Sequence, residues 1–163
     1  MISSKVVKFL IIRFSSIGDI VLTTPVVRCL KDQFDGNAVI HYLTKEAFSP
    51  VINANPNIDR IFQIKKHTKE VIDVLLNENY DYIIDLHHNL RSAVVKRQLK
   101  KICFTIDKLN FKKWLFVNFK IDKLPDIHIV DRYMETLKVF GIVNDQKGLD
   151  YFIPENEAVP ISS

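Results

Sequence analysis

The 163-residue sequence predicts an α/β fold in which helices cover both faces of a parallel β-sheet. Short apolar segments of strand length alternate along the chain with longer segments whose apolar residues recur at helical spacing. The composition agrees, because 47% of the residues are hydrophobic and 26% are charged, as in globular domains. We therefore expect one domain over residues 1–148, followed by a linker or tail over residues 149–163.

Five segments are expected to form strands. The first of them, residues 6–12, is apolar at almost every position, which is typical of a strand covered on both faces. The later segments are shorter and are bounded by polar or turn-forming residues. The five predicted strands span residues 6–12, 38–43, 58–64, 82–86 and 102–106.

The first predicted helix contains a proline. The apolar residues between positions 27 and 34 share one helical face, but Pro25 allows two interpretations. Thr24 and Pro25 could begin the helix, or Pro25 could kink a longer helix that begins near Gly18. The kinked helix is the favoured interpretation.

Further helices are predicted between and after the strands, over residues 46–53, 68–78, 90–101, 111–119 and 126–140. The last has the clearest pattern, because Ile129, Tyr133 and Leu137 lie on one stripe. Gly141 follows it at the position where glycine commonly ends a helix.

Two further features place the chain in the cytoplasm. Cys29 and Cys103 lack any close spacing, which favours reduced cysteines in a packed core over a disulfide. The apolar run of residues 6–12 is too short to cross a membrane and leads directly into Arg13, so it resembles neither a signal peptide nor a membrane span.

The turn after the first strand is the first candidate site. In an open parallel sheet, ligands bind beyond the carboxyl ends of the strands. Here Ser15, Ser16, Gly18 and Asp19 supply two hydroxyl groups, a flexible glycine and a carboxylate at the start of a helix. Asp19 could accept a proton there, or it could simply cap the helix. The turn lacks the glycine patterns of dinucleotide and nucleotide-phosphate loops.

The turn after the fourth strand is the second candidate. Asp85 ends the strand, and His87, His88, Asn89 and Arg91 follow it. Arg91 near a helix start could bind a carboxylate or phosphate, although it could instead pair with Asp85. A metal site is not expected, because the adjacent histidines should point to opposite sides and no third ligand stands at a suitable spacing.

Basic residues form two clusters that could meet phosphates or an anionic membrane. One follows the third strand and the other lies on the predicted helix over residues 90–101, where a solvated outer face is the simpler explanation. The aromatic residues of 111–119 could rest on lipid, although packing in the core is favoured. Nucleic-acid binding is not expected, because the basic residues are dispersed and no recognition motif occurs. The clusters comprise Lys65, Lys66, His67 and Lys69, and Lys96, Arg97, Lys100 and Lys101.

Three motifs together resemble the ADP-heptose:lipopolysaccharide heptosyltransferases of glycosyltransferase family 9. The first is a strand followed by S-S-x-G-D at residues 15–19 and a helix with T-x-P. The second is N-P-x-I-D at residues 55–59, and the third is D-L-x-x-N-x-R-S at residues 85–92. Their order and spacing agree over about residues 5 to 141, whereas His87-His88 replaces a Gln-Gly pair common in the family, so the acceptor's identity stays open.

The resemblance implies the N-terminal, Rossmann-like half of a GT-B glycosyltransferase, which inverts the anomeric centre without a metal. The family's S-S-x-G-D aspartate is taken as the catalytic base, which makes Asp19 the expected base. Ser15, Ser16, Gly18, Asn89 and Arg91 are then expected to bind the acceptor, a growing lipopolysaccharide core with carboxylates and phosphates. That acceptor suggests peripheral contact with the inner face of the cytoplasmic membrane.

No other cofactor is implied, because the nucleotide sugar, ADP-heptose in this family, binds to a C-terminal domain that these 163 residues do not include. The chain alone is therefore expected to be inactive. Two other functions stay open: a non-catalytic module that binds a saccharide or a lipid headgroup, and another Rossmann-like enzyme. The missing glycine-rich turn counts against the latter.

Overall fold

The computed structural model describes residues 6–106 and 128–154 and contains a five-stranded parallel sheet in the order β3-β2-β1-β4-β5. The register pairs Ile12, the last residue of β1, with Leu43 of β2 and with Asp85 of β4. The turns that follow β1 and β4 therefore leave the same edge of the sheet side by side. The strands are β1 (Val6–Ile12), β2 (Asn37–Lys45), β3 (Arg60–Ile64), β4 (Tyr82–Asp85) and β5 (Ile102–Thr105).

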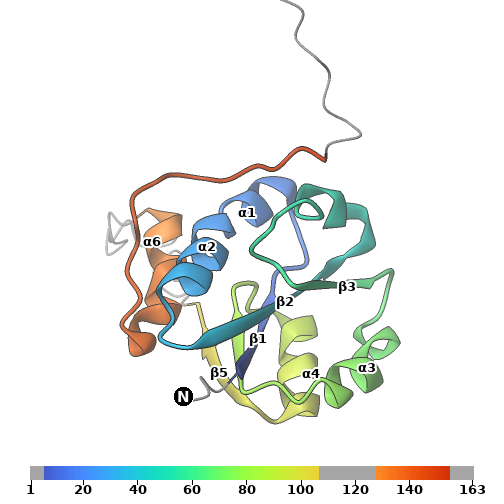
Figure 1. Cartoon of the computed structure of the whole chain (residues 1–163). Coiled ribbons are helices and arrows are strands. Elements are labelled where there is room, and N and C mark those ends of the chain that lie inside the picture. Colours follow the sequence, from blue (N-terminus) through green and yellow to red (C-terminus); the bar gives the residue numbers. More distant parts are fainter. Residues whose placement is uncertain (1–5, 107–127, 155–163) are drawn as a thin grey trace, which may run out of the picture.

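Helices cover both faces of this sheet, as predicted (Figure 1). Side chains alternate along β1, so Phe9 and Ile11 belong to one buried cluster, and Leu10 and Ile12 to the other. The first cluster includes side chains of α2 (Thr24–Gln33) and α6 (Ile129–Met134). The second includes side chains of α3 (Ile72–Asn77) and α4 (Leu90–Leu99).

Both cysteines are free, in agreement with the prediction. Cys29 belongs to the first cluster and Cys103 packs against the second, so the two cysteines lie on opposite faces of the sheet.

The prediction of one kinked helix was wrong, because α1 (Ile17–Val21) and α2 are separate helices. Pro25 has no backbone N–H and stands in the first turn of α2, where that loss costs nothing. The hydroxyl of Thr23 donates to the carbonyl of Ile20 (2.7 Å), and that of Thr24 to the carbonyl of Val21 (2.8 Å). The two threonines thus satisfy carbonyl groups at the end of α1.

Several predicted helices are partly or wholly 3-10 helices. Residues 46–53 form η1 (Glu46–Val51), while η2 (Thr68–Glu70) precedes α3. The last predicted helix continues from α6 into η3 (Glu135–Phe140) and ends at Gly141, whose φ of 73° is left-handed, as expected for a glycine stop. The predicted helix over residues 111–119 lies outside the described residues.

After Gly141 the chain runs back along the helices that cover one face of the sheet, the face that carries Phe9 and Ile11. This segment, residues 142–154, is called the strap, and it passes α6 and α2 (Figure 1). Arg28 of α2 binds both carboxylate oxygens of Asp145 (2.8 Å each), the carboxylate of Asp150 and the carbonyl of Gly148 (2.9 Å). Asp150 also donates its N–H to the hydroxyl of Thr24 (2.9 Å). Contacts with the domain thus continue past residue 148, whereas the division into domain and linker stays a prediction.

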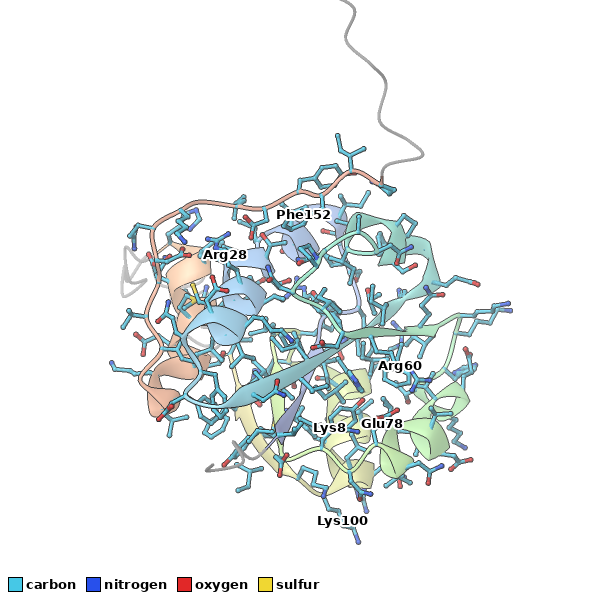
Figure 2. All side chains as sticks on the ribbon, viewed as in Figure 1. Lys8, Arg28, Arg60, Glu78, Lys100 and Phe152 are labelled. Atoms are coloured by element: carbon cyan, nitrogen blue, oxygen red, sulfur yellow. The ribbon has the colours of Figure 1, made fainter. Side chains whose placement is uncertain are left out.

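The amino-terminal edge of the sheet is closed by charged side chains (Figure 2). Glu78 accepts from Lys8 Nζ (3.0 Å) with one oxygen and from Arg60 Nη1 (2.6 Å) with the other. Nearby, Nδ1 of buried His41 lies 2.9 Å from the hydroxyl oxygen of Tyr80. These groups therefore form hydrogen bonds and ion pairs with one another at this edge.

Candidate active site

The S-S-x-G-D turn is held between two buried side chains. Phe14 and Ile20 are fully buried on either side of it, whereas Ser16, Ile17 and Gly18 are exposed. The exposed residues therefore lie at the carboxyl edge of the sheet, where the first candidate site was predicted.

The carboxylate of Asp19 is anchored through only one of its oxygens. Oδ2 accepts from the N–H of Ser16 (3.1 Å) and the hydroxyl of Ser16 (2.9 Å), and it pairs with Nη2 of Arg13 (2.7 Å). Within the described part of the chain, Oδ1 accepts no hydrogen bond. Because the side chain is 38% exposed, Oδ1 is open to a ligand.

These contacts keep Asp19 ionised. Partial burial by itself raises the pKa of the carboxyl group, but the Ser16 amide, the Ser16 hydroxyl and the Arg13 guanidinium outweigh it. The pKa of Asp19 therefore lies below its ordinary value. At neutral pH the open oxygen belongs to a carboxylate, which can accept a proton.

Arg13 is a site residue that the sequence analysis missed. Its Nε donates to the carbonyl of Ser15 (2.8 Å) and its Nη1 to the carbonyl of Leu86 (2.7 Å), while Nη2 holds Asp19. Its guanidinium also lies 5.9 Å from the centre of the Tyr133 ring. One side chain thus joins the first turn to the second. A charged residue directly after an apolar strand at the ligand edge is the signal that could have identified it.

Asp85 of the second turn is a structural residue. It is fully buried, pairs with Lys96 Nζ (2.7 Å) and accepts from the N–H groups of His87 (3.1 Å) and His88 (2.8 Å). Burial raises its pKa, but Lys96, the N–H of His88 and the Ser92 side chain outweigh that effect and lower it. The suggested Asp85–Arg91 pair was therefore wrong, and Lys96 is not part of a solvated face, because its side chain turns inward to this carboxylate.

The two histidines point in different directions, as predicted. The His87 ring packs edge-on against Phe14 with ring centres 5.3 Å apart, whereas Nδ1 of His88 lies 2.8 Å from the carbonyl oxygen of Ile106. Over residues 6–106 and 128–154, no three His, Cys, Asp or Glu side chains are grouped so that they could hold a metal ion.

Asn89 and Arg91 begin α4 at the same edge. Asn89 is the N-cap, because its Oδ1 accepts from the N–H of Ser92 (2.9 Å), and the Ser92 hydroxyl accepts from the N–H of Asn89 (3.0 Å). Arg91 is exposed and forms no ion pair within the described residues. Its guanidinium is thus available for an anionic group.

A cavity of about 710 Å³, called the groove, lies between η2 and the start of α4. Glu70 fixes the loop on one side by accepting from the N–H groups of Lys65 (2.8 Å), Lys66 (3.0 Å) and His67 (2.7 Å). These bonds lower the pKa of Glu70 to about 2. The residues lining the groove are Lys66, His67, Thr68, Lys69, Glu70, Leu90, Arg91 and Val94.

The motif at residues 55–59 has a structural role. Asp59 accepts from the N–H of Ile40 (2.7 Å) and from Lys31 Nζ (2.8 Å) at the start of β3. Oδ1 of Asn55 accepts from the N–H of Asn57 (3.0 Å). This motif therefore shapes the connection from η1 to β3 and contributes no side chain to the groove.

The prediction that Asp19 and Arg91 share one edge of a sheet with five or more strands is confirmed, since each follows a neighbouring parallel strand. The chain also matches the model of the family described as glycosyltransferase family 9 (heptosyltransferase) over residues 69–157, more than half of its length. The chain belongs to glycosyltransferase family 9. The matched region includes the D-L-x-x-N-x-R-S turn and the strap.

Curated relatives agree with this family. The chain is 32% identical over 123 residues to lipopolysaccharide heptosyltransferase 1 of Campylobacter coli, across 72% of this chain and 36% of that protein. It is 27% identical over 140 residues to lipopolysaccharide heptosyltransferase 3 of Escherichia coli K12, across 78% and 40%. The chain thus spans about two fifths of the length of these relatives.

Solved structures show the same fold. A family 9 glycosyltransferase of Veillonella parvula superposes with a TM-score of 0.71 at 22% identity, over 91% of this chain and 46% of that one. The E. coli heptosyltransferase WaaC with ADP superposes with a TM-score of 0.67 at 23% identity, over 88% and 50%. The chain therefore has the fold of one half of a GT-B heptosyltransferase. No helix in its described residues is long and apolar enough to span a membrane.

Proposed function

We propose that this chain supplies the acceptor-binding half and the catalytic base of a glycosyltransferase that transfers a heptose or a related sugar to a lipopolysaccharide core. The donor is a nucleotide sugar, with ADP-heptose the first choice. The observation that carries the proposal is the carboxylate of Asp19, which is anchored through Oδ2 and open at Oδ1. The names of the curated relatives support the class of acceptor.

In this mechanism the acceptor hydroxyl donates a hydrogen bond to Oδ1 of Asp19. As its oxygen attacks the anomeric carbon, the proton moves to Oδ1, and the bond between that carbon and the nucleotide phosphate breaks with its electron pair leaving on the phosphate. Attack from the opposite face inverts the anomeric centre. Because the pKa of Asp19 is lowered, we expect proton transfer late in the step, when the forming bond has made the hydroxyl strongly acidic.

Other residues of the two turns bind and orient the acceptor. Ser15, Ser16 and Gly18 shape the loop beside the reacting hydroxyl, and Arg91 binds a carboxylate or phosphate of the acceptor. Asn89 already uses Oδ1 as a helix cap, so its amide NH₂ is the group left for the acceptor. Metal-free transfer follows from the family resemblance, and the donor and its departing nucleotide are stabilised by the other half. This chain alone should therefore bind acceptor and transfer nothing.

The decisive experiment is Asp19→Asn in a two-domain enzyme that contains this chain. Asparagine keeps the size and the capping ability of aspartate but cannot accept the proton, so turnover should fall at least about a hundredfold. Acceptor affinity and melting temperature should stay near those of the parent. Turnover is measured with an ADP-heptose donor, and acceptor binding is measured by titration without donor.

Asp73→Asn is the matched control, since Asp73 is another exposed aspartate in the first turn of a short helix. It should leave turnover unchanged. Nearly parental turnover of the Asp19→Asn enzyme would reduce Asp19 to a helix cap. Acceptor binding with no transfer by any two-domain preparation would instead favour the non-catalytic binding module.

A further inference from the structure

We infer that the groove between η2 and α4 is a docking surface for an anionic phospholipid bilayer. This goes beyond the proposed reaction, because it concerns a surface beside the catalytic turn and does not depend on the role of Asp19. The inference depends on four side chains that line the groove. Leu90 and Val94 belong to α4, Lys66 lies in the loop before η2, and Lys69 lies in η2.

Leu90 presents an apolar side chain that the fold does not use. It is the first residue of α4 and is 87% exposed, and Val94, one turn later, is 42% exposed. The inward side of the same helix is formed by Val95 and Leu99, which are buried. Residues four apart lie on one face of a helix, so Leu90 and Val94 form a continuous apolar edge that points away from the core.

Cationic side chains line the same groove as this apolar edge. Lys66 and Lys69 line the groove from the loop before η2 and from η2, and neither is assigned to the acceptor in the proposed reaction. Among the described residues that line the groove, Glu70 is the only acidic one, and its two oxygens already accept three backbone N–H groups. An exposed apolar edge bordered by cations complements a bilayer surface, where anionic headgroups lie directly above hydrocarbon.

A sugar is a poorer match for the same surface. Sugar hydroxyl groups need acceptors as well as donors, and the side chains around Leu90 and Val94 offer mainly donors. A bilayer needs no acceptors, because its phosphates accept and its acyl chains contact the apolar residues. The groove lies at the same edge of the sheet as Asp19. Docking would therefore orient the S-S-x-G-D turn towards molecules anchored in the bilayer.

Vesicle co-sedimentation of the chain tests the docking surface. The parent chain should bind vesicles that mix phosphatidylcholine with phosphatidylglycerol, more weakly as salt is raised, and should not bind phosphatidylcholine alone. Leu90→Ser should weaken binding about tenfold, because the buried hydrocarbon is lost. The double variant Lys66→Gln/Lys69→Gln should weaken it by at least about tenfold.

Matched controls come from the opposite side of the sheet. Val139→Ser and Lys138→Gln change an exposed valine and an exposed lysine of η3, and they should bind like the parent. Circular dichroism checks that each variant is folded, and Asp19→Asn should also bind normally. Parental binding by both groove variants, or no binding by the parent, would overturn the inference. Loss in the lysine variant with full binding by Leu90→Ser would also overturn it, since it would indicate a simple anion site.

Discussion

Two arginine–aspartate clusters, one around Arg13 and one around Arg28, differ in whether they leave a carboxylate oxygen open. Arg28 binds Asp145 through both carboxylate oxygens and also binds Asp150, and the Asp145 side chain is only 14% exposed. Arg13 binds Asp19 through a single oxygen, and that side chain is 38% exposed. In the Arg28 cluster both oxygens of Asp145 are bound, whereas in the Arg13 cluster only one oxygen of Asp19 is bound.

The difference separates a structural ion pair from a candidate catalytic one. Arg28 holds the pKa of Asp145 far below its ordinary value, and Arg13 and Ser16 also lower that of Asp19. Both carboxylates are therefore charged at neutral pH. Of the two, only Asp19 has a carboxylate oxygen that accepts no hydrogen bond within the described residues, so the geometry of the second oxygen, rather than the charge, distinguishes them.

Removal of Arg28 should have the largest effect on stability. Arg28→Met removes the guanidinium that pairs with the carboxylates of Asp145 and Asp150 in the strap, and we expect a loss of about 3 kcal/mol in the free energy of unfolding. This is the lower end of the range for a broken buried pair, because the strap can turn both groups towards water. Urea unfolding measures it.

The same cluster should make stability depend on pH. Because the pKa of Asp145 is lower in the folded chain than in the unfolded one, its contribution is complete at neutral pH and is lost as the pH falls below about 4. Arg28→Met should flatten that decline. Lys147→Met is the control, since Lys147 is 68% exposed and 3.9 Å from the same carboxylate, and it should change little. Equal losses of unfolding free energy in Arg28→Met and Lys147→Met would show that Arg28 is not the main partner of Asp145.

Replacing Arg13 should have a smaller effect on stability and a clear effect on Asp19. Arg13→Gln removes a positive charge and a hydrogen bond that both lower the pKa of Asp19, so that pKa should rise. The loss of the bond to the Leu86 carbonyl should cost about 1 kcal/mol. Carbon NMR titration of the Asp19 carboxyl group in this chain measures the shift. An unchanged pKa would show that Ser16 alone sets the charge of Asp19.

Gly18→Ala should have the smallest effect on folding. A Cβ at Gly18 would meet no atom within 4 Å, and alanine favours helices, so the free energy of unfolding should change by less than about 1 kcal/mol. If the loop lies against the acceptor, the added methyl group should still weaken acceptor binding. Calorimetric titration of acceptor and thermal melting separate the two effects. Normal binding would show that the acceptor does not approach Gly18.

Local patterns predicted most of the fold because they depend on neighbouring residues. The alternating apolar segments identified the five strands, and Gly141 marked the end of the last helix correctly. The break between α1 and α2 was mispredicted because the hydroxyl groups of Thr23 and Thr24 satisfy carbonyls that a kinked helix would leave open. That choice depends on side-chain rotamers, which the apolar pattern does not contain.

The sequence by itself determined the family, the parallel α/β fold and the two turns that meet at one edge of the sheet, because these follow from residue order and spacing. Only the tertiary structure decided which charges pair: Asp85 with Lys96 rather than Arg91, and Asp19 with Arg13. Pairing depends on which side chains the sheet brings within a few ångströms. Residues 13 and 86 are far apart in sequence, yet they meet because β1 and β4 are neighbouring strands.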